Sequence, residues 1–142
     1  MLEEIAAWAG KTVEIPSDAY RAMTPEELNQ LEDGGLMEVG AHTVNHPQLS
    51  FQTPEVQREE IFSSKADLED MVNHRVGEFS YPYGGHSDVT ISLVEEAGYD
   101  HSVSTHQESV WHRSRPFEIP RIEITNISGE EFEKRLSGWL NS

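Results

Sequence analysis

The sequence contains no cysteine and few positive charges, and both absences restrict what the protein can do. Without cysteine the chain can form neither a disulfide scaffold nor a thiolate metal site, so any metal ion must be held by histidine, carboxylate or water. The chain has 10 lysines and arginines against 26 aspartates and glutamates, a formal net charge of −16. Since nucleic acids and anionic membranes are bound through lysine and arginine, this balance argues against both as partners.

Long apolar runs are also absent. No segment approaches the roughly 18 consecutive apolar residues that indicate a membrane-spanning helix. Residues 1–4, Met-Leu-Glu-Glu, are acidic where a secretory leader would be positively charged. We therefore expect no membrane span, and the N-terminal pattern favours the cytoplasm over export. The 142 residues suffice for one domain with one hydrophobic core, so we expect residues 1–142 to form a single domain.

Helical and extended patterns alternate along the chain. Apolar spacing and capping residues predict helices at 2–9, 24–33, 53–74, 87–97 and 128–140, and strands at 36–39, 78–81, 99–104 and 119–124. Such alternation is typical of βαβ units, hence of an α/β fold with a parallel sheet or a barrel segment. Leu28 and Leu31 are expected to be buried, and so are the periodic apolar residues of the last helix, namely Phe132, Leu136, Trp139 and Leu140.

Two histidines, His42 and His46, stand four residues apart just after the strand expected at 36–39. If the turn between them is helical, both imidazoles lie on one face and can reach one metal ion. The end of a strand is also where open α/β sheets and barrels place their active sites. Isolated pairs with this spacing arise by chance as well, so the pattern alone leaves a metal site and two structural histidines both open. His74, His101, His106 and His112 are expected at the surface or in structural hydrogen bonds, whereas the role of His86, next to the Gly84-Gly85 turn, stays open.

The segment Ser80-Tyr81-Pro82-Tyr83-Gly84-Gly85 also follows an expected strand. Its proline and glycines permit a tight turn with unusual backbone torsions. Such a loop can direct a backbone N–H at a developing oxyanion, or it can be a purely structural turn. No third zinc ligand, paired carboxylate base, nucleophile elbow or phosphate-binding loop is evident elsewhere.

Taken together, these segments resemble the carbohydrate esterase family 4 polysaccharide deacetylases. Residues 40–47, Gly-Ala-His-Thr-Val-Asn-His-Pro, resemble the His-[Ser/Thr]-x-x-His metal motif of that family. The segments 79–84, 96–99 and 117–121 then follow in the order in which the family has its further motifs. The resemblance extends over about residues 24–140, which is nearly the whole chain.

The resemblance implies a partial distorted (β/α) barrel with about four strands and flanking helices. It also implies a metal-dependent hydrolase that removes N- or O-acetyl groups from a polysaccharide or oligosaccharide. The metal, most often zinc in this family, is held by one aspartate and two histidines, here His42 and His46. The backbone N–H of Tyr83 would belong to the oxyanion hole, and Thr43 would support the metal loop by hydrogen bonding. Residues expected to bind the glycan are Tyr81, Pro82, Tyr83 and Arg121.

Three departures from the family pattern concern catalysis. The Thr-Phe-Asp-Asp motif, which provides the base and the third ligand, should precede His42, where only Asp18 and Asp33 occur and neither has that setting. Ser80 stands where many members have arginine. A late Leu-x-His general acid is missing, with His106 as a candidate substitute.

These departures predict the C-terminal part of a deacetylase domain, weakly active or inactive alone. The opened barrel would expose strand edges that favour a homo-oligomer. One alternative is a non-catalytic glycan-binding or assembly module with a degenerate deacetylase fold. Another is a structural α/β domain in which the histidine spacing is accidental.

Overall fold

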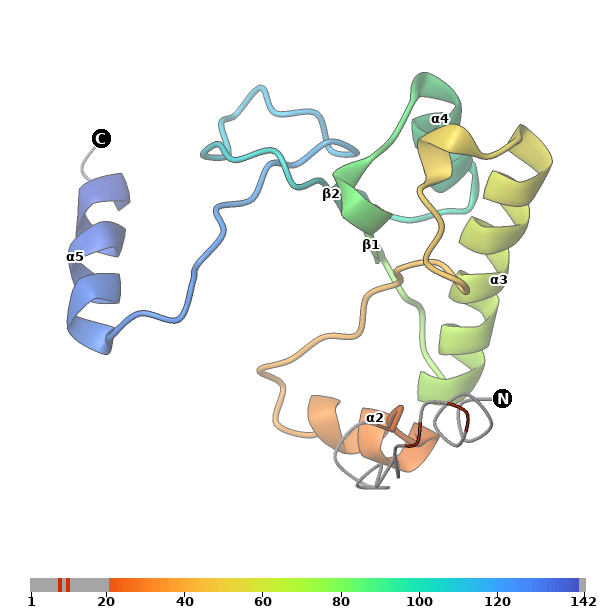
Figure 1. The fold of residues 1–142 in the computed structure, drawn as a ribbon, viewed down its shortest axis with the longest axis horizontal. Coiled ribbons are helices and arrows are strands. Elements are labelled where there is room, and N and C mark those ends of the chain that lie inside the picture. Colours follow the sequence, from red (N-terminus) through yellow and green to blue (C-terminus); the bar gives the residue numbers. More distant parts are fainter. Residues whose placement is uncertain (1–7, 9, 11–20, 141–142) are drawn as a thin grey trace.

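The computed structural model describes residues 8, 10 and 21–140 (Figure 1). It contains helices α2 (Pro25–Glu32), α3 (Pro54–Val72), α4 (Asp88–Glu96) and α5 (Gly129–Leu140), strands β1 (Glu78–Ser80) and β2 (His101–Val103), and two 3₁₀ turns, η1 (Leu49–Phe51) and η2 (Pro82–Gly84). All four helices expected after residue 20 are therefore confirmed. The helix expected at 2–9 falls almost entirely outside the described residues. None of the described helices is both long and apolar enough to cross a membrane.

The helix starts follow the capping signals of the sequence. Thr24 accepts a hydrogen bond from the Glu27 N–H (3.3 Å), and the Glu27 carboxylate accepts one from the Thr24 N–H (2.8 Å). This reciprocal pair satisfies two amide donors that have no partner inside the helix. Ser87 forms a similar reciprocal pair with Thr90 at the start of α4, whereas Thr53 caps α3 by accepting one hydrogen bond from the Val56 N–H. Local sequence therefore determines where the helices begin.

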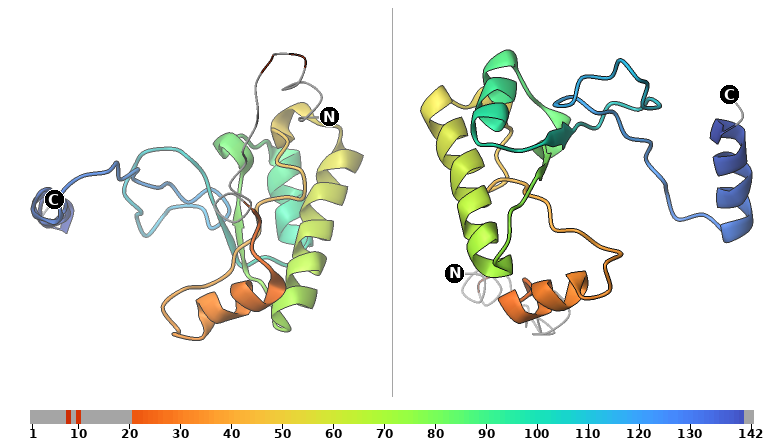
Figure 2. Two further views of the ribbon diagram at one scale, coloured as in Figure 1. Left: turned by 60° about the horizontal axis from the view of Figure 1, so that its bottom comes forward. Right: turned by 180° about the vertical axis from the view of Figure 1, so that it is seen from behind.

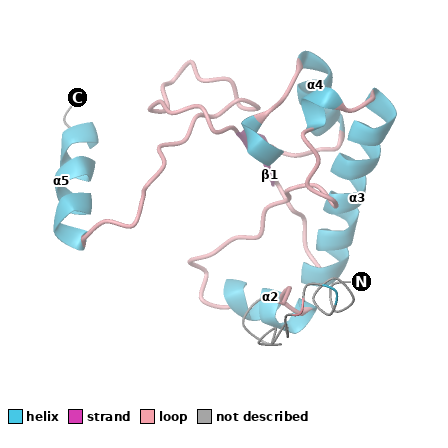
Figure 3. Cartoon of the chain, viewed as in Figure 1, coloured by secondary structure: helices cyan, strands magenta, loops and turns pink. Residues whose placement is uncertain are grey.

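The sheet consists of parallel segments in chain order. Strands β1 and β2 pair in parallel, from Glu78 opposite His101 to Ser80 opposite Val103. Isolated parallel bridges then join Ala41 to Phe79 and Val103 to Ile119, which adds one neighbour at each edge. No strand forms at 36–39, where the nearest bridging residue is Ala41, and the strand expected at 119–124 is reduced to Ile119; both segments are loop in Figure 3. Four consecutive parallel segments form part of a distorted (β/α) barrel, as predicted.

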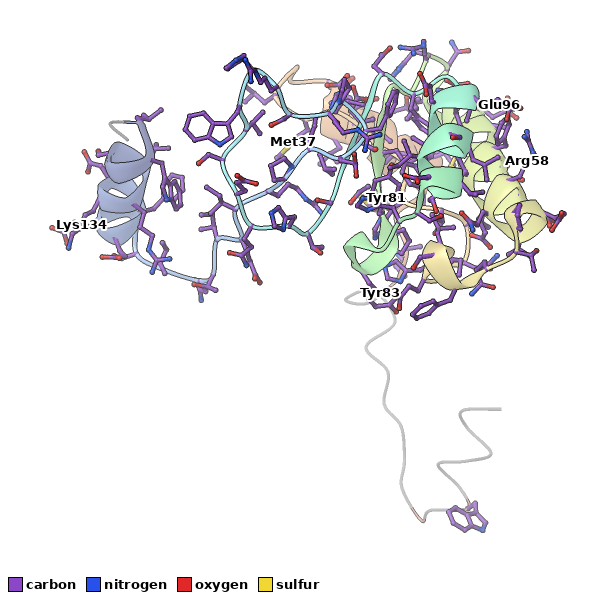
Figure 4. All side chains as sticks on the ribbon, turned by 90° about the horizontal axis from the view of Figure 1, so that it is seen from above. Met37, Arg58, Tyr81, Tyr83, Glu96 and Lys134 are labelled. Atoms are coloured by element: carbon purple, nitrogen blue, oxygen red, sulfur yellow. The ribbon has the colours of Figure 1, made fainter. Side chains whose placement is uncertain are left out.

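One face of this sheet is covered by α3 and α4, and the core lies between them (Figures 1 and 2). Phe79 is 1% exposed and belongs to the same buried cluster as Ile61 and Val94. Tyr99 adds a ring contact with Phe79, with centroids 5.1 Å apart, and its hydroxyl donates to the Ile61 carbonyl (3.2 Å). The bidentate ion pair of Arg58 with Glu96 joins α3 to α4 on the outer surface (Figure 4).

The terminal helices are less buried than their apolar patterns predicted. In α2, Leu31 is 43% exposed, and only Leu28 packs partly against the core. The predicted buried face of α5 is wrong, because Phe132 and Leu136 are each 39% exposed and Leu140 is 78% exposed. Helix α5 stands apart from α3 and α4 at the end of an extended segment (Figure 2). Periodicity showed which face of α5 is apolar, but it did not show that Phe132, Leu136 and Leu140 on that face stay exposed.

Helix α2 is attached to the C-terminal end of α3 by polar contacts. Asn29 Nδ2 donates to the Met71 carbonyl (2.9 Å), and His74 Nε2 lies 2.8 Å from a Glu32 carboxylate oxygen. The carbonyl of Arg75, and after it the Glu32 carboxylate, raise the pKa of His74 above its ordinary value. One of the two contacts therefore depends on the charge of an exposed histidine.

This contact predicts that stability falls as the pH rises above about 6.5, the ordinary histidine pKa. A histidine with a raised folded pKa stabilises fully below its unfolded pKa, and that contribution disappears as the pH rises through the folded pKa. We expect the urea midpoint of the wild type to fall between about pH 6 and pH 8.5, with a smaller fall in His74→Gln. Because His74 is exposed, the effect should be small. His112→Gln, also at the surface, should behave like the wild type, and an equal fall in His74→Gln would contradict the assignment.

Candidate active site

The two histidines of the His-x-x-x-His segment lie together, although not for the reason that the spacing suggested. The expected helical turn is absent, since Thr43 and His46 both have left-handed backbone conformations, with φ of 65° and 56°. The His42 and His46 rings nevertheless have centroids 4.7 Å apart at an interplanar angle of 69°. A tight loop, rather than helical periodicity, therefore brings the two imidazoles together.

Hydrogen bonds orient this loop from both sides. His42 Nδ1 lies 2.6 Å from the Ser80 carbonyl oxygen. Since a carbonyl can only accept, Nδ1 carries the proton and the Nε2 lone pair is left available to a metal ion. Thr43 Oγ1 accepts a hydrogen bond from the His46 N–H (3.0 Å), which is the support expected of Thr43. Ser80 thus contributes its backbone carbonyl at the position where many family members carry arginine.

A buried glutamate that sequence reasoning missed also holds this loop. Glu60, 7% exposed, accepts hydrogen bonds from the Val44 and Asn45 N–H groups and from Asn45 Nδ2. Burial raises the pKa of Glu60, but the three hydrogen bonds together lower it by more than burial raises it. The pKa of Glu60 is therefore below its ordinary value. The residue belongs to the polar buried stripe of α3 formed by Gln57, Glu60 and Ser64, which the apolar spacing did not reveal.

The Pro82–Gly84 turn places Tyr83 against the histidines. Tyr83 has φ 57° and ψ 9°, and its ring centroid lies 4.7 Å from that of His46. The side chain is 66% exposed and lies at the surface in Figure 4. Its backbone N–H donates to no other residue in the described part of the chain. Tyr83 thus combines an open ring face with an available N–H donor next to the imidazole pair.

Tyr81, which precedes this turn, and Pro82, which begins it, were both expected to bind the glycan, but both side chains are buried. Tyr81 is 0% exposed, and its hydroxyl donates to the Phe117 carbonyl (2.9 Å) and accepts from Ser102 Oγ (2.7 Å). Burial raises the pKa of Tyr81 to about 12, although the hydrogen bond from Ser102 acts in the opposite direction. Neither side chain offers a surface to a ligand, so both support the turn from below.

Arg121 and His106 have no described contact with His42 or His46. Arg121 Nε donates to the Ser104 carbonyl (2.8 Å), and Arg121 lines a hollow of about 390 Å³ with Thr105 and Gln107. His42 lines a different hollow, of about 300 Å³, on the open face of the sheet. His106 is exposed, and its Nε2 lies 3.3 Å from Glu108. The structure therefore joins Tyr83 to the histidine pair but gives Arg121 and His106 other neighbours.

The donor set fits a divalent metal ion only in part. A catalytic zinc site normally has three protein ligands, and neutral imidazole nitrogens are suitable for two of them. Within residues 8, 10 and 21–140, no group of three histidine, aspartate or glutamate side chains could hold a metal ion. Asp33 follows α2 and lines a hollow with His74, and Asp18 is outside the described residues. The described residues thus offer two candidate ligands, His42 and His46.

The chain is similar to a protein family and to a curated protein. A family model described as polysaccharide deacetylase matches residues 5–102. The curated protein "Putative polysaccharide deacetylase YxkH" of Bacillus subtilis is 25% identical over 111 residues, 78% of this chain and 39% of its own length.

Solved structures agree in fold. The Streptococcus pyogenes deacetylase PplD, in complex with acetate, has a TM-score of 0.75 and 27% identity, covering 84% of this chain and 53% of its own. A polysaccharide deacetylase from Bacillus cereus has a TM-score of 0.70 at 22% identity, covering 82% of this chain and 37% of its own. The chain therefore spans about half, or less, of the length of these relatives.

Proposed function

Since this chain belongs to the polysaccharide deacetylase family, we propose that it serves in the metal-dependent removal of N- or O-acetyl groups from a polysaccharide. The observation that supports this most is the pair of adjacent imidazoles, with His42 Nδ1 bound to the Ser80 carbonyl. That hydrogen bond leaves the opposite ring nitrogen free, which is the arrangement found in metal-ligating histidines.

In this proposal, His42 and His46 hold a divalent metal ion, most consistent with zinc because the ligands are imidazoles. The third protein ligand and the general base would come from outside the described residues. When bound, such an ion polarises a carbonyl group and lowers the pKa of a water molecule. A net charge of −16 does not oppose binding of a neutral or amine-bearing glycan.

The remaining residues would bind and orient the acetylated sugar. We propose that the Tyr83 N–H donates to the acetyl oxygen as negative charge develops on it, because the turn leaves this donor available. The exposed Tyr83 ring offers an apolar face to a sugar. Tyr81 and Pro82 would act indirectly by holding the turn. Arg121, with Nε engaged by Ser104, would bind glycan hydroxyls at a more distant subsite.

A second candidate function is a non-catalytic glycan-binding or assembly module, and one observation favours it. The described residues supply two metal ligands rather than three. A two-ligand site would bind metal more weakly and offer no positioned base, while the glycan contacts of Tyr83 could persist. Association into a homo-oligomer through the strand edges stays a prediction under either function.

Acetate release measured beside glycan binding separates the two functions. Penta-N-acetylchitopentaose and an O-acetylated xylan would be incubated with zinc-treated protein, with His46→Ala and His112→Ala variants in parallel. A deacetylase should release acetate in the wild type and in His112→Ala but not in His46→Ala. Saturable glycan binding without acetate release would support the binding module. If the wild type neither bound glycan nor released acetate, both functions would be contradicted.

A further inference from the structure

We propose that Glu60 is a positioning residue for the metal site, since its buried carboxylate holds the 42–46 loop in the conformation that brings His42 and His46 together. This inference rests on the proposed function, because it assigns Glu60 a role in that site. Glu60 contacts neither imidazole in the structure; it acts through the residues between them.

The geometry of the contact is that of an anion-binding loop. Glu60 Oε2 accepts from two successive backbone groups, the Val44 N–H (2.9 Å) and the Asn45 N–H (2.8 Å). Oε1 accepts from Asn45 Nδ2 at 2.7 Å. Successive N–H groups directed at one oxygen form a concavity that selects negative charge. Both carboxylate oxygens are therefore used, and every donor comes from the two residues that separate Thr43 from His46.

The loop needs such support because its backbone is strained. Thr43 is β-branched and has φ 65°, and His46 has φ 56°, a region that residues other than glycine seldom adopt. Strained torsions persist only where surrounding contacts hold them. If the carboxylate were lost, three donors in the loop would lose their acceptor and could regain hydrogen bonds to water by relaxing away from α3. The two imidazoles would then separate.

Helix α3 provides a rigid base for Glu60. Its neighbour Ile61 is 0% exposed in the core, and Gln57, one turn earlier, is 3% exposed. Gln57 accepts from Thr90 Oγ1 on α4 (2.7 Å) and donates to the Gln52 carbonyl (2.9 Å). The position of Glu60 is thus determined by the packing between α3 and α4. Functional sites are held more accurately when their supporting groups lie on rigid elements of this kind.

The test is Glu60→Gln, with Glu59→Gln as the matched control. Gln at position 60 keeps the size of the side chain but replaces one acceptor oxygen by an NH₂ group, which faces donors. Glu59 is the exposed neighbour on the same helix, so its variant loses the same charge without touching the loop. Removing a direct hydrogen-bond partner of a metal ligand typically lowers metal affinity about 10- to 100-fold, and because Glu60 acts through Val44 and Asn45 the lower end, about 10-fold, applies. We expect that loss of zinc affinity in Glu60→Gln and none in Glu59→Gln.

Amide hydrogen exchange in metal-free protein gives a second readout that does not depend on zinc. Glu60→Gln should speed exchange at Val44 and Asn45 while core amides of α3 keep their protection. Asn45→Ala, which removes a single hydrogen bond at an exposed position, should show a smaller effect in the same direction, and it remains informative if Glu60→Gln does not fold. Unchanged exchange at Val44 and Asn45 in both variants would overturn the proposal. If the wild type binds no zinc, the proposed function fails, but exchange still decides whether Glu60 holds the loop.

Discussion

A His42→Ala/His46→Ala double variant should lose the zinc binding that the wild type shows. We expect the wild type to bind zinc at about the micromolar level, which corresponds to about 8 kcal/mol. The reason is that the two ring centroids lie 4.7 Å apart and the Ser80 carbonyl fixes the tautomer of His42. Alanine removes both candidate nitrogen ligands, and no group of three suitable side chains occurs among the described residues. Calorimetric titration of zinc into metal-free protein measures the difference.

The matched control for this titration is His106→Ala/His112→Ala. Both of these histidines are exposed and lie outside the hollow that His42 lines. The control variant should bind zinc like the wild type, which excludes a general loss of weak surface binding. Equal zinc binding by the wild type and the His42→Ala/His46→Ala variant would show that the pair does not hold the metal. The metal-dependent part of the proposed function would then be withdrawn.

Gly84→Ala should destabilise the protein by about 2–4 kcal/mol, since it combines left-handed strain with overpacking. Gly84 has φ 71°, and a methyl group there would lie 2.7 Å from the Thr105 nitrogen and 2.8 Å from the Thr105 Cβ. These atoms belong to the loop that follows β2, so the turn itself must move. Because Tyr83 precedes Gly84, its N–H and ring would be displaced from His46. Urea unfolding measures the loss of stability.

Gly98→Ala separates the effect of close packing from that of backbone conformation. Gly98 has φ 82°, but a methyl group there meets no atom within 4 Å. Only the torsional penalty remains, and we expect a loss of about 1 kcal/mol. Similar losses in the two variants would mean that Thr105 does not restrict the turn. A clearly larger loss for Gly84→Ala would show that Thr105 determines where Tyr83 lies.

Family membership and partial length together limit what can be concluded about activity. The family model matches residues 5–102, and the fold agrees with deacetylases of known structure. The chain spans 39% of YxkH and 53% of PplD. The described residues include two candidate metal ligands and one candidate oxyanion donor, so hydrolysis would need further groups from outside the described residues. Acetate release therefore tests whether this chain supplies those further groups.

The sequence by itself determined the features that depend on neighbours along the chain. Thr24, Thr53 and Ser87 identified the starts of three helices because a cap is a contact within one turn. The alternation of strands and helices indicated the parallel order, and the ordered motifs indicated the family. The prediction that Thr43 supports the loop also succeeded, since its partner is three residues away.

The tertiary structure alone decided which side chains form the site. Glu60 lies 15 residues after Asn45, its nearest partner in the sequence, and only the packing of α3 brings the two residues together. The tertiary structure also decided the exposure of two tyrosines that stand two residues apart, since Tyr81 is 0% exposed and Tyr83 is 66% exposed. Caps and periodicity report contacts within a turn or two of chain. Burial and loop closure depend on contacts between distant segments, which no local pattern records.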